Sequence, residues 1–175
     1  YSPPPIQTYT KKNTWVIKYN DPQQHGNATG CAFWGVHTLL KTDPEFIRIS
    51  LMVWGHKKIE NIHIIQNPML VHHFSQYCKS LEKLHGTVKI SDAWHGSSSV
   101  KNMHQICQVG FSNAMSQSQV YGWGTYFADN VNYCIPRYSV CLGGSTHCVL
   151  LSKLALGKSQ AGVSSDKSIS YDHAG

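Results

Sequence analysis

The chain has 175 residues, which suits one domain with a sizeable buried core. Its hydrophobic fraction of 41% contains no apolar run near the roughly 18–20 residues that cross a bilayer, and no basic-then-apolar leader opens it. We therefore expect no membrane partner and an intracellular protein, nuclear or cytoplasmic. The net charge of +6 is spread over only 14% charged residues, which fits an anionic small ligand better than a dedicated nucleic-acid surface.

The first predicted elements are an arm and three strands. Residues 1–13 are proline-rich and predict an extended arm ahead of a domain that spans residues 14–175. Apolar and β-branched residues then predict strands over residues 14–20, 46–55 and 59–65, and the pattern alternates in the first and third of them.

Two helices are predicted next. The first lies within residues 66–86, where Pro68 suits the first turn and Gly86 ends the helix. The second lies within residues 100–111 and ends at Gly110. The apolar residues expected to share one face are Leu70, Phe74, Tyr77, Cys78 and Leu81 in the first helix, and Val100, Met103, Ile106 and Cys107 in the second.

The last predicted strand covers residues 147–157, and the tail after it looks like a loop throughout. Short strands mixed with two modest helices indicate an α+β domain with a largely antiparallel sheet. The six cysteines form no CxxC pair, so we expect reduced thiols. A zinc site is a disfavoured alternative, because its candidate ligands Cys134, Cys141, His147 and Cys148 lack the usual paired spacing.

Two glycine-containing segments carry the candidate chemistry. A strand ends in His95, Gly96 and Ser97, and about thirty residues later comes the aromatic turn YGWGTYFA at residues 121–128. Glycine lets a ligand meet backbone N–H and C=O groups directly, and a tyrosine face stacks on a planar ring. Together these groups suit a nucleotide that carries a flat amide-substituted ring.

These segments resemble a known family. AWHGSSSVKNMHQICQVGF followed by YGWGTYFADNVNYCIPRYS resembles the catalytic domain of the poly(ADP-ribose) polymerase (PARP) family of ADP-ribosyltransferases, with its His-Gly-Thr/Ser turn, its helix and its Y-G-x-G-x-Y-F-A turn. IENIHIIQNPMLVHHF and LSKLALGK extend the resemblance to roughly residues 59–172. It implies a split, largely antiparallel β core with flanking helices, NAD+ as the substrate, and no metal.

The resemblance also implies roles for individual residues. His95 would hold a ribose hydroxyl, the Gly96 backbone would pair with the nicotinamide carboxamide, and Ser97 would support that turn or the adenosine side. Tyr126 would pack on the nicotinamide as the second member of a His-Tyr-Glu triad, and Tyr138 would stack on the other face, with Tyr133 as a weaker candidate. The expected catalytic pair is His95 and Tyr126, and the expected NAD+ contacts are His95, Gly96, Ser97, Tyr121, Gly124, Tyr126, Tyr133, Cys134 and Tyr138.

Two departures from the family pattern affect the expected activity. Cys134 aligns with a serine that usually bonds the carboxamide, and a thiol is a weaker donor than a hydroxyl. The third triad position would lie beyond the loop after LALGK, whereas the last glutamate of the chain is Glu82, upstream of His95. We therefore expect a C-terminally incomplete domain that does not elongate polymer.

The expected function is the transfer of single ADP-ribose units from NAD+ to a protein or nucleic-acid acceptor, with release of nicotinamide. The alternative is a catalytically inactive relative that acts as a structural module in a larger assembly, with a partner chain that completes or uses the fold. A reader of ADP-ribose or RNA is a weaker third alternative. Phe127 is expected in the core, Trp123 at the pocket rim, and His72 and His73 in solvent or packed.

Overall fold

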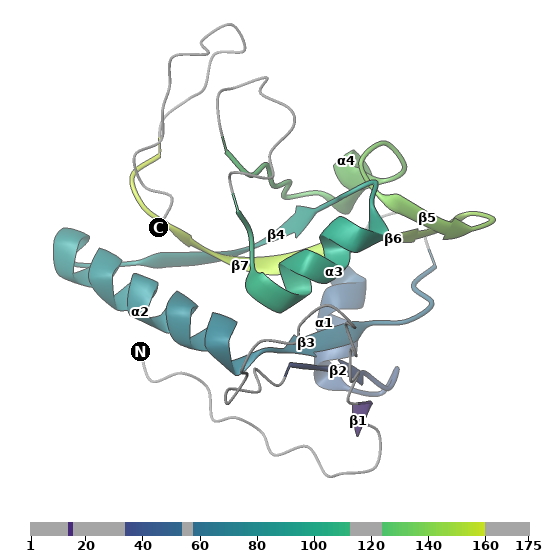
Figure 1. Ribbon diagram of the computed structural model, residues 1–175, viewed down its shortest axis with the longest axis horizontal. Helices are drawn as coiled ribbons and strands as arrows, with labels where there is room; N and C mark the ends of the chain where they lie inside the picture. The colour runs from purple at the N-terminus through teal and green to yellow at the C-terminus, as the bar shows by residue number, and fades with distance from the viewer. Residues whose placement is uncertain (1–13, 16–33, 54–57, 113–123, 160–175) are drawn as a thin grey trace, which may run out of the picture. The chain divides into compact units, whose positions relative to one another are not determined.

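The computed structural model describes residues 14–15, 34–53, 58–112 and 124–159 (Figure 1). The chain separates into two compact units, residues 1–75 and 76–175, which are described in turn. Within the described ranges no helix has both the length and the apolar character that crossing a membrane would require. The predicted arm over residues 1–13 and the tail from residue 160 lie outside the described residues, and the single domain over residues 14–175 stays a prediction.

The first unit contains a three-stranded antiparallel sheet with the strand order β1-β2-β3 and one complete helix. The predicted strand over residues 14–20 is confirmed at its start, and the rest of it lies outside the described residues. The strand predicted over residues 59–65 is present but begins later, and β2 was not predicted. The elements are β1 Thr14–Trp15, β2 Gly35–Thr38, α1 Pro44–Met52 and β3 His63–Gln66.

The predicted strand over residues 46–55 is wrong, because its first seven residues lie in the helix α1. Phe46 and Ile49 are the buried residues of this helix, and their spacing of three places them on one helical face. A bidentate ion pair joins Glu45 to Arg48, with nitrogen–oxygen distances of 2.7 and 2.8 Å. The helix starts with a proline and an acidic residue, two signals for a helix N-terminus.

The helix α2 spans Pro68–His85, which confirms the prediction, including the proline at its start. Gly86 follows with φ of +79°, a left-handed conformation that glycine adopts without strain. Leu81 is buried, and the four other residues predicted to share its face are partly buried, whereas the two neighbouring histidines His72 and His73 are exposed. The 3.6-residue periodicity therefore identified the inward face of this helix correctly.

The described part of the second unit contains, after α2, two antiparallel strand pairs and two helices. β4 (Lys89–His95) pairs with β7 (Leu150–Leu156) along its whole length, from Lys89 opposite Leu156 to His95 opposite Leu150. β5 (Val140–Gly143) pairs with β6 (Thr146–Cys148). α3 (Val100–Val109) follows β4, and the single-turn helix α4 (Val131–Cys134) precedes β5. Figure 1 shows the long β4–β7 ribbon beside α3.

The predicted strand over residues 147–157 is divided in two, because its first residues belong to β6 and the rest form β7 after Val149. The helix predicted within residues 100–111 is confirmed as α3, with Met103 buried and Gly110 at φ of +87°, although Val100 is exposed. Every strand pair in the described ranges is antiparallel, which confirms the predicted α+β class.

Candidate functional site

The site is built on the carboxyl end of β4. Trp94 is 5% exposed and sits between two partners: it lies opposite Leu151 of β7 and forms an isolated bridge with Ala128. Both bridge hydrogen bonds are short, 2.7 Å from the Trp94 N–H to the Ala128 carbonyl and 2.8 Å in the reverse direction. Ala128, the last residue of the aromatic turn, therefore pairs with β4, and residues 95–98 and 124–128 line one cavity.

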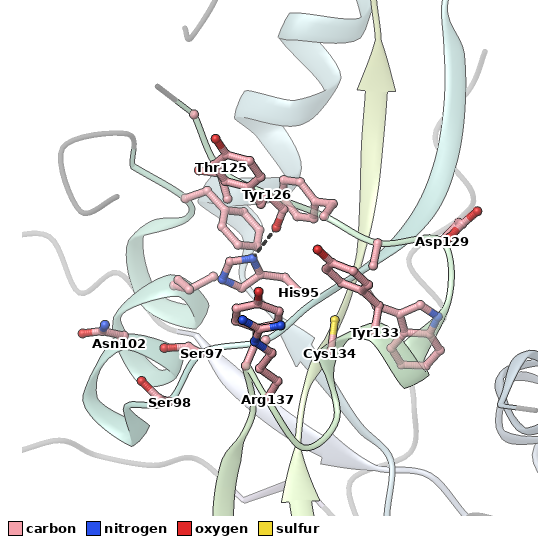
Figure 2. Close-up of a pocket in the computed structure, with 18 of the residues that line it drawn as sticks. His95, Ser97, Ser98, Asn102, Thr125, Tyr126, Asp129, Tyr133, Cys134 and Arg137 are labelled. Atoms are coloured by element: carbon pink, nitrogen blue, oxygen red, sulfur yellow. Dashed lines mark hydrogen bonds between the residues drawn. The ribbon is translucent and has the colours of Figure 1, made fainter. Parts of the chain in front are cut away.

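His95 is fixed by a hydrogen bond and two aromatic contacts. Its Nδ1 lies 2.9 Å from the carbonyl oxygen of Tyr126 (Figure 2). Because a carbonyl can only accept, Nδ1 carries the proton, which makes Nε2 the acceptor nitrogen of the neutral ring. The ring edge also contacts Phe111 and Phe127, with centroids 5.0 and 5.5 Å away. These contacts hold the imidazole in one orientation at the cavity wall.

Gly96 follows directly after the end of β4 and lines the cavity. A Cβ atom on Gly96 would lie 2.5 Å from the carbonyl oxygen of Tyr138 and 2.9 Å from its carbonyl carbon. Glycine is therefore required here for steric reasons, because the Tyr138 backbone packs directly on it.

The serines after Gly96 organise the start of α3. The Ser97 hydroxyl accepts from the Ser99 N–H at 3.3 Å, and the Ser99 hydroxyl caps the helix by accepting from the Asn102 N–H at 3.3 Å. The expected support of this turn by Ser97 agrees with that geometry. Its contact with a ligand stays a prediction.

The opposite wall carries a pair of tyrosines. The rings of Tyr133 and Tyr138 are stacked, with centroids 5.7 Å apart and planes 26° apart. The Tyr138 N–H donates to the Cys134 carbonyl at 2.9 Å, which ties the turn that follows to α4. Cys134 itself is buried, and burial raises the pKa of its thiol. Tyr126, Tyr133 and Tyr138 are 40%, 66% and 41% exposed, and the Tyr138 ring is contacted by both Tyr133 and the Arg137 guanidinium.

The cavity between these walls has a volume of about 1220 Å³, which lies above the usual range for small-molecule pockets and leaves space for a dinucleotide. All of the predicted contact residues within the described ranges line it: His95, Gly96, Ser97, Gly124, Tyr126, Tyr133, Cys134 and Tyr138. Tyr121 and Trp123 lie outside the described residues. The structure thus brings the predicted residues together, and their roles toward a ligand stay predictions.

Several lining residues were missed at the level of sequence. Phe111 and Phe127 contact each other at 4.9 Å and support His95, so Phe127 is a half-buried wall residue as well as a packing residue. Arg137 and Asp129 are the lining residues with permanent charges in the described ranges. Arg137 immediately precedes Tyr138, and that adjacency to a predicted ring-stacking residue was the available signal.

The zinc alternative finds no support in the described part of the chain, where no group of three or more His, Cys, Asp or Glu side chains could hold a metal ion. His147 lies within the second unit and places its Nδ1 2.9 Å from the Ser139 hydroxyl. The five cysteines of the described ranges are thiols, as expected: Cys78, Cys107, Cys134, Cys141 and Cys148.

Comparison with known proteins identifies the family of the chain. Residues 52–175 match the family profile described as the poly(ADP-ribose) polymerase catalytic domain. The human protein mono-ADP-ribosyltransferase PARP14 is 34% identical over 101 residues, an alignment that covers 54% of this chain and 6% of the relative. The chain therefore spans only a small part of that relative's length, and the family match includes every predicted site residue.

Proposed function

The chain belongs to the poly(ADP-ribose) polymerase catalytic-domain family, and from that premise we propose that it binds NAD+ in the cavity beside His95 and transfers single ADP-ribose units to a protein acceptor. Nicotinamide is the leaving group. The name of the human relative specifies a protein mono-ADP-ribosyltransferase, and this supports single-unit transfer over chain extension.

One observation carries the proposal: an oriented histidine and three exposed tyrosine rings surround a single cavity that is floored by a glycine backbone. The exposed Tyr126 ring offers apolar surface to a nicotinamide ring, and the stacked Tyr133 and Tyr138 rings form a second aromatic wall of the cavity. The Gly96 N–H and C=O offer a donor and an acceptor to its planar carboxamide. The cavity thus has a complementary group for each part of the reacting end of NAD+.

The chemistry that these residues supply is mainly orientation. When the bond between nicotinamide and ribose breaks, positive charge develops on the ribose, and a ring and sugar held in a fixed geometry reach that state at lower entropic cost. His95 Nε2 accepts from a ribose hydroxyl, because Nδ1 is already committed to the Tyr126 carbonyl. The hydrogen bond from His95 Nδ1 to the Tyr126 carbonyl links the histidine that holds the ribose to the loop that carries the Tyr126 ring.

Label transfer from adenine-labelled NAD+ to protein tests the proposal, with mass spectrometry to count the units at each modified residue. We expect labelling and single mass increments in the wild type, and loss of at least about a hundredfold in the rate for His95→Ala and for Tyr126→Ala. His72→Ala is the matched control, because His72 is an exposed histidine on α2 that does not line the cavity. Its labelling should equal that of the wild type.

The outcomes separate the candidate functions. Undiminished labelling in His95→Ala and Tyr126→Ala would show that transfer does not use this cavity. Absence of label in the wild type, together with a rise in Tm on adding NAD+, would indicate a binding module, since a ligand that binds the native state stabilises it. Absence of both would favour the structural-module alternative.

A further inference from the structure

Among the described residues that line the cavity, Arg137 is the one permanent cation. Its guanidinium lies 5.5 Å from the centre of the Tyr138 ring, and the residue is exposed and lines the cavity. Within the described ranges this guanidinium forms no hydrogen bond or ion pair with the protein. The contact with the Tyr138 face restricts the side chain and leaves all of its N–H donors available.

In the described part of the chain, no carboxylate pairs with Arg137. Asp129 is the carboxylate among the described lining residues, and Figure 2 shows it on the far side of Tyr133 from Arg137, with its oxygens turned outward. The other lining residues are neutral polar or apolar, apart from His95. A guanidinium without a carboxylate partner at a cavity wall is a ready site for an anion.

The position of Arg137 in the cavity narrows the choice of anion. Its backbone neighbour Tyr138 packs directly on Gly96, and Arg137 lines the same cavity as Gly96 and Ser97. When the nicotinamide ring of NAD+ lies beside Tyr138, the ribose and the pyrophosphate attached to it extend from Tyr138 into the rest of the cavity. Guanidinium geometry matches two phosphate oxygens at once, which an ammonium does not.

We propose that Arg137 binds the pyrophosphate of NAD+ and thereby makes the site selective for dinucleotide over ligands that carry only the nicotinamide ring. The inference rests on the proposed function for the identity of the substrate. The pyrophosphate keeps its charge when the bond to nicotinamide breaks. The contact is therefore equally strong before and during the reaction, so it lowers KM and leaves kcat unchanged.

Calorimetric binding to the protein tests this with three probes: NAD+, ADP-ribose and nicotinamide. ADP-ribose has the pyrophosphate and lacks the ring, whereas nicotinamide has the ring and lacks the pyrophosphate. We expect Arg137→Gln to weaken NAD+ and ADP-ribose about tenfold, the usual size for a hydrogen-bonded charge in contact with solvent, and to leave nicotinamide within about twofold. Arg137→Lys should retain part of the affinity, because it keeps the charge and loses the two-pronged contact.

Lys101→Gln is the matched control. Lys101 is an exposed cation on α3 that does not line the cavity, and its removal changes the net charge by the same amount. It should leave all three affinities unchanged. Raising the salt concentration should weaken ADP-ribose binding more in the wild type than in Arg137→Gln, because screening acts on the contact that the variant lacks.

Each remaining outcome overturns the inference in a distinguishable way. If the wild type and Arg137→Gln bind ADP-ribose equally, Arg137 does not contact the pyrophosphate, and the proposed function still stands. If Arg137→Gln weakens nicotinamide as much as NAD+, the residue acts through the Tyr138 ring instead. If the wild type binds none of the three probes, the proposed function fails and this inference fails with it.

Discussion

Replacing Gly96 with alanine tests how closely the two walls of the cavity approach. The new Cβ would lie 2.5 Å from the Tyr138 carbonyl oxygen, and a contact below 3.4 Å is already tight, so the two backbones would have to separate by roughly 0.9 Å. Neither partner is the end of a flexible side chain that could swing aside. We expect Gly96→Ala to lower the free energy of unfolding by about 1–3 kcal/mol, the usual cost of overpacking.

Thermal or urea unfolding measures this cost, which corresponds to a drop in Tm of about 2–4 °C per kcal/mol for a chain of this size. Gly124→Ala is the stability control, because a Cβ at Gly124 meets nothing within 4 Å. Its Tm should stay within about 1 °C of the wild type. A Gly96→Ala protein that unfolds at the wild-type temperature and binds nicotinamide with wild-type affinity would refute the close approach of Gly96 and Tyr138.

The remaining predictions concern the helix cap and the buried thiol. Ser99→Ala removes the hydroxyl that caps α3 and should lower the free energy of unfolding in urea by about 1 kcal/mol. Ser99→Asp should retain most of the stability, because its carboxylate can also cap the helix. Equal stability of the wild type and both variants would contradict the cap. Iodoacetamide at pH 8 should alkylate exposed Cys141 faster than buried Cys134, because burial raises the pKa of Cys134 and suppresses its thiolate, and the two rates should converge in urea. Because burial raises the pKa of the Cys134 thiol, the folded protein holds this proton more tightly than the unfolded protein does. The resulting contribution to the free energy of unfolding is fully present below the unfolded pKa of about 8.5 and is lost as the pH rises through the folded pKa. Urea unfolding between pH 7 and 10 should therefore show a falling free energy of unfolding.

Periodicity predicted the helices better than the strands. α2 and α3 were both predicted, because a stripe of apolar residues at helical spacing, a proline at the start of α2 and a glycine after each helix all agree. In α1 the local signals conflict: residues 46–53 are rich in β-branched and large apolar side chains, and the acidic N-terminal turn is short. The burial of Phe46 and Ile49 decides the conformation, and that depends on tertiary packing, which the sequence does not display.

The division between β6 and β7 could not be predicted for a related reason. Residues 146–156 are apolar enough for one continuous strand, and nothing in their composition marks Val149 as a break. The partners determine the break, because His147 pairs with β5 whereas Leu150 begins the pairing with β4. A strand is defined by its neighbours, and a single segment contains no information about which neighbour it will meet.

The site was largely predictable in its residues and not in its contacts. The aromatic turn and the His95-Gly96-Ser97 segment are recognisable as motifs, but a motif does not reveal that the Tyr126 carbonyl accepts from His95. Nor does it reveal Arg137, which belongs to no pattern and becomes significant only because its neighbour Tyr138 packs on Gly96. Such residues are found from spatial proximity and charge, which require the fold.

The last two residues of β4 and the glycine that follows them explain how a strand end organises the cavity. Trp94 pairs with Ala128, His95 donates to the Tyr126 carbonyl, and Gly96 contacts the Tyr138 backbone. Because successive side chains of a strand point to opposite faces, a slip of one residue in the pairing with β7 would turn the His95 side chain to the opposite face of the strand. The seven-residue register with β7 prevents that slip, and burial of Trp94 at 5% exposure stabilises it. The orientation of the ligand-facing groups is therefore determined by the packing of a core residue one position earlier in the chain.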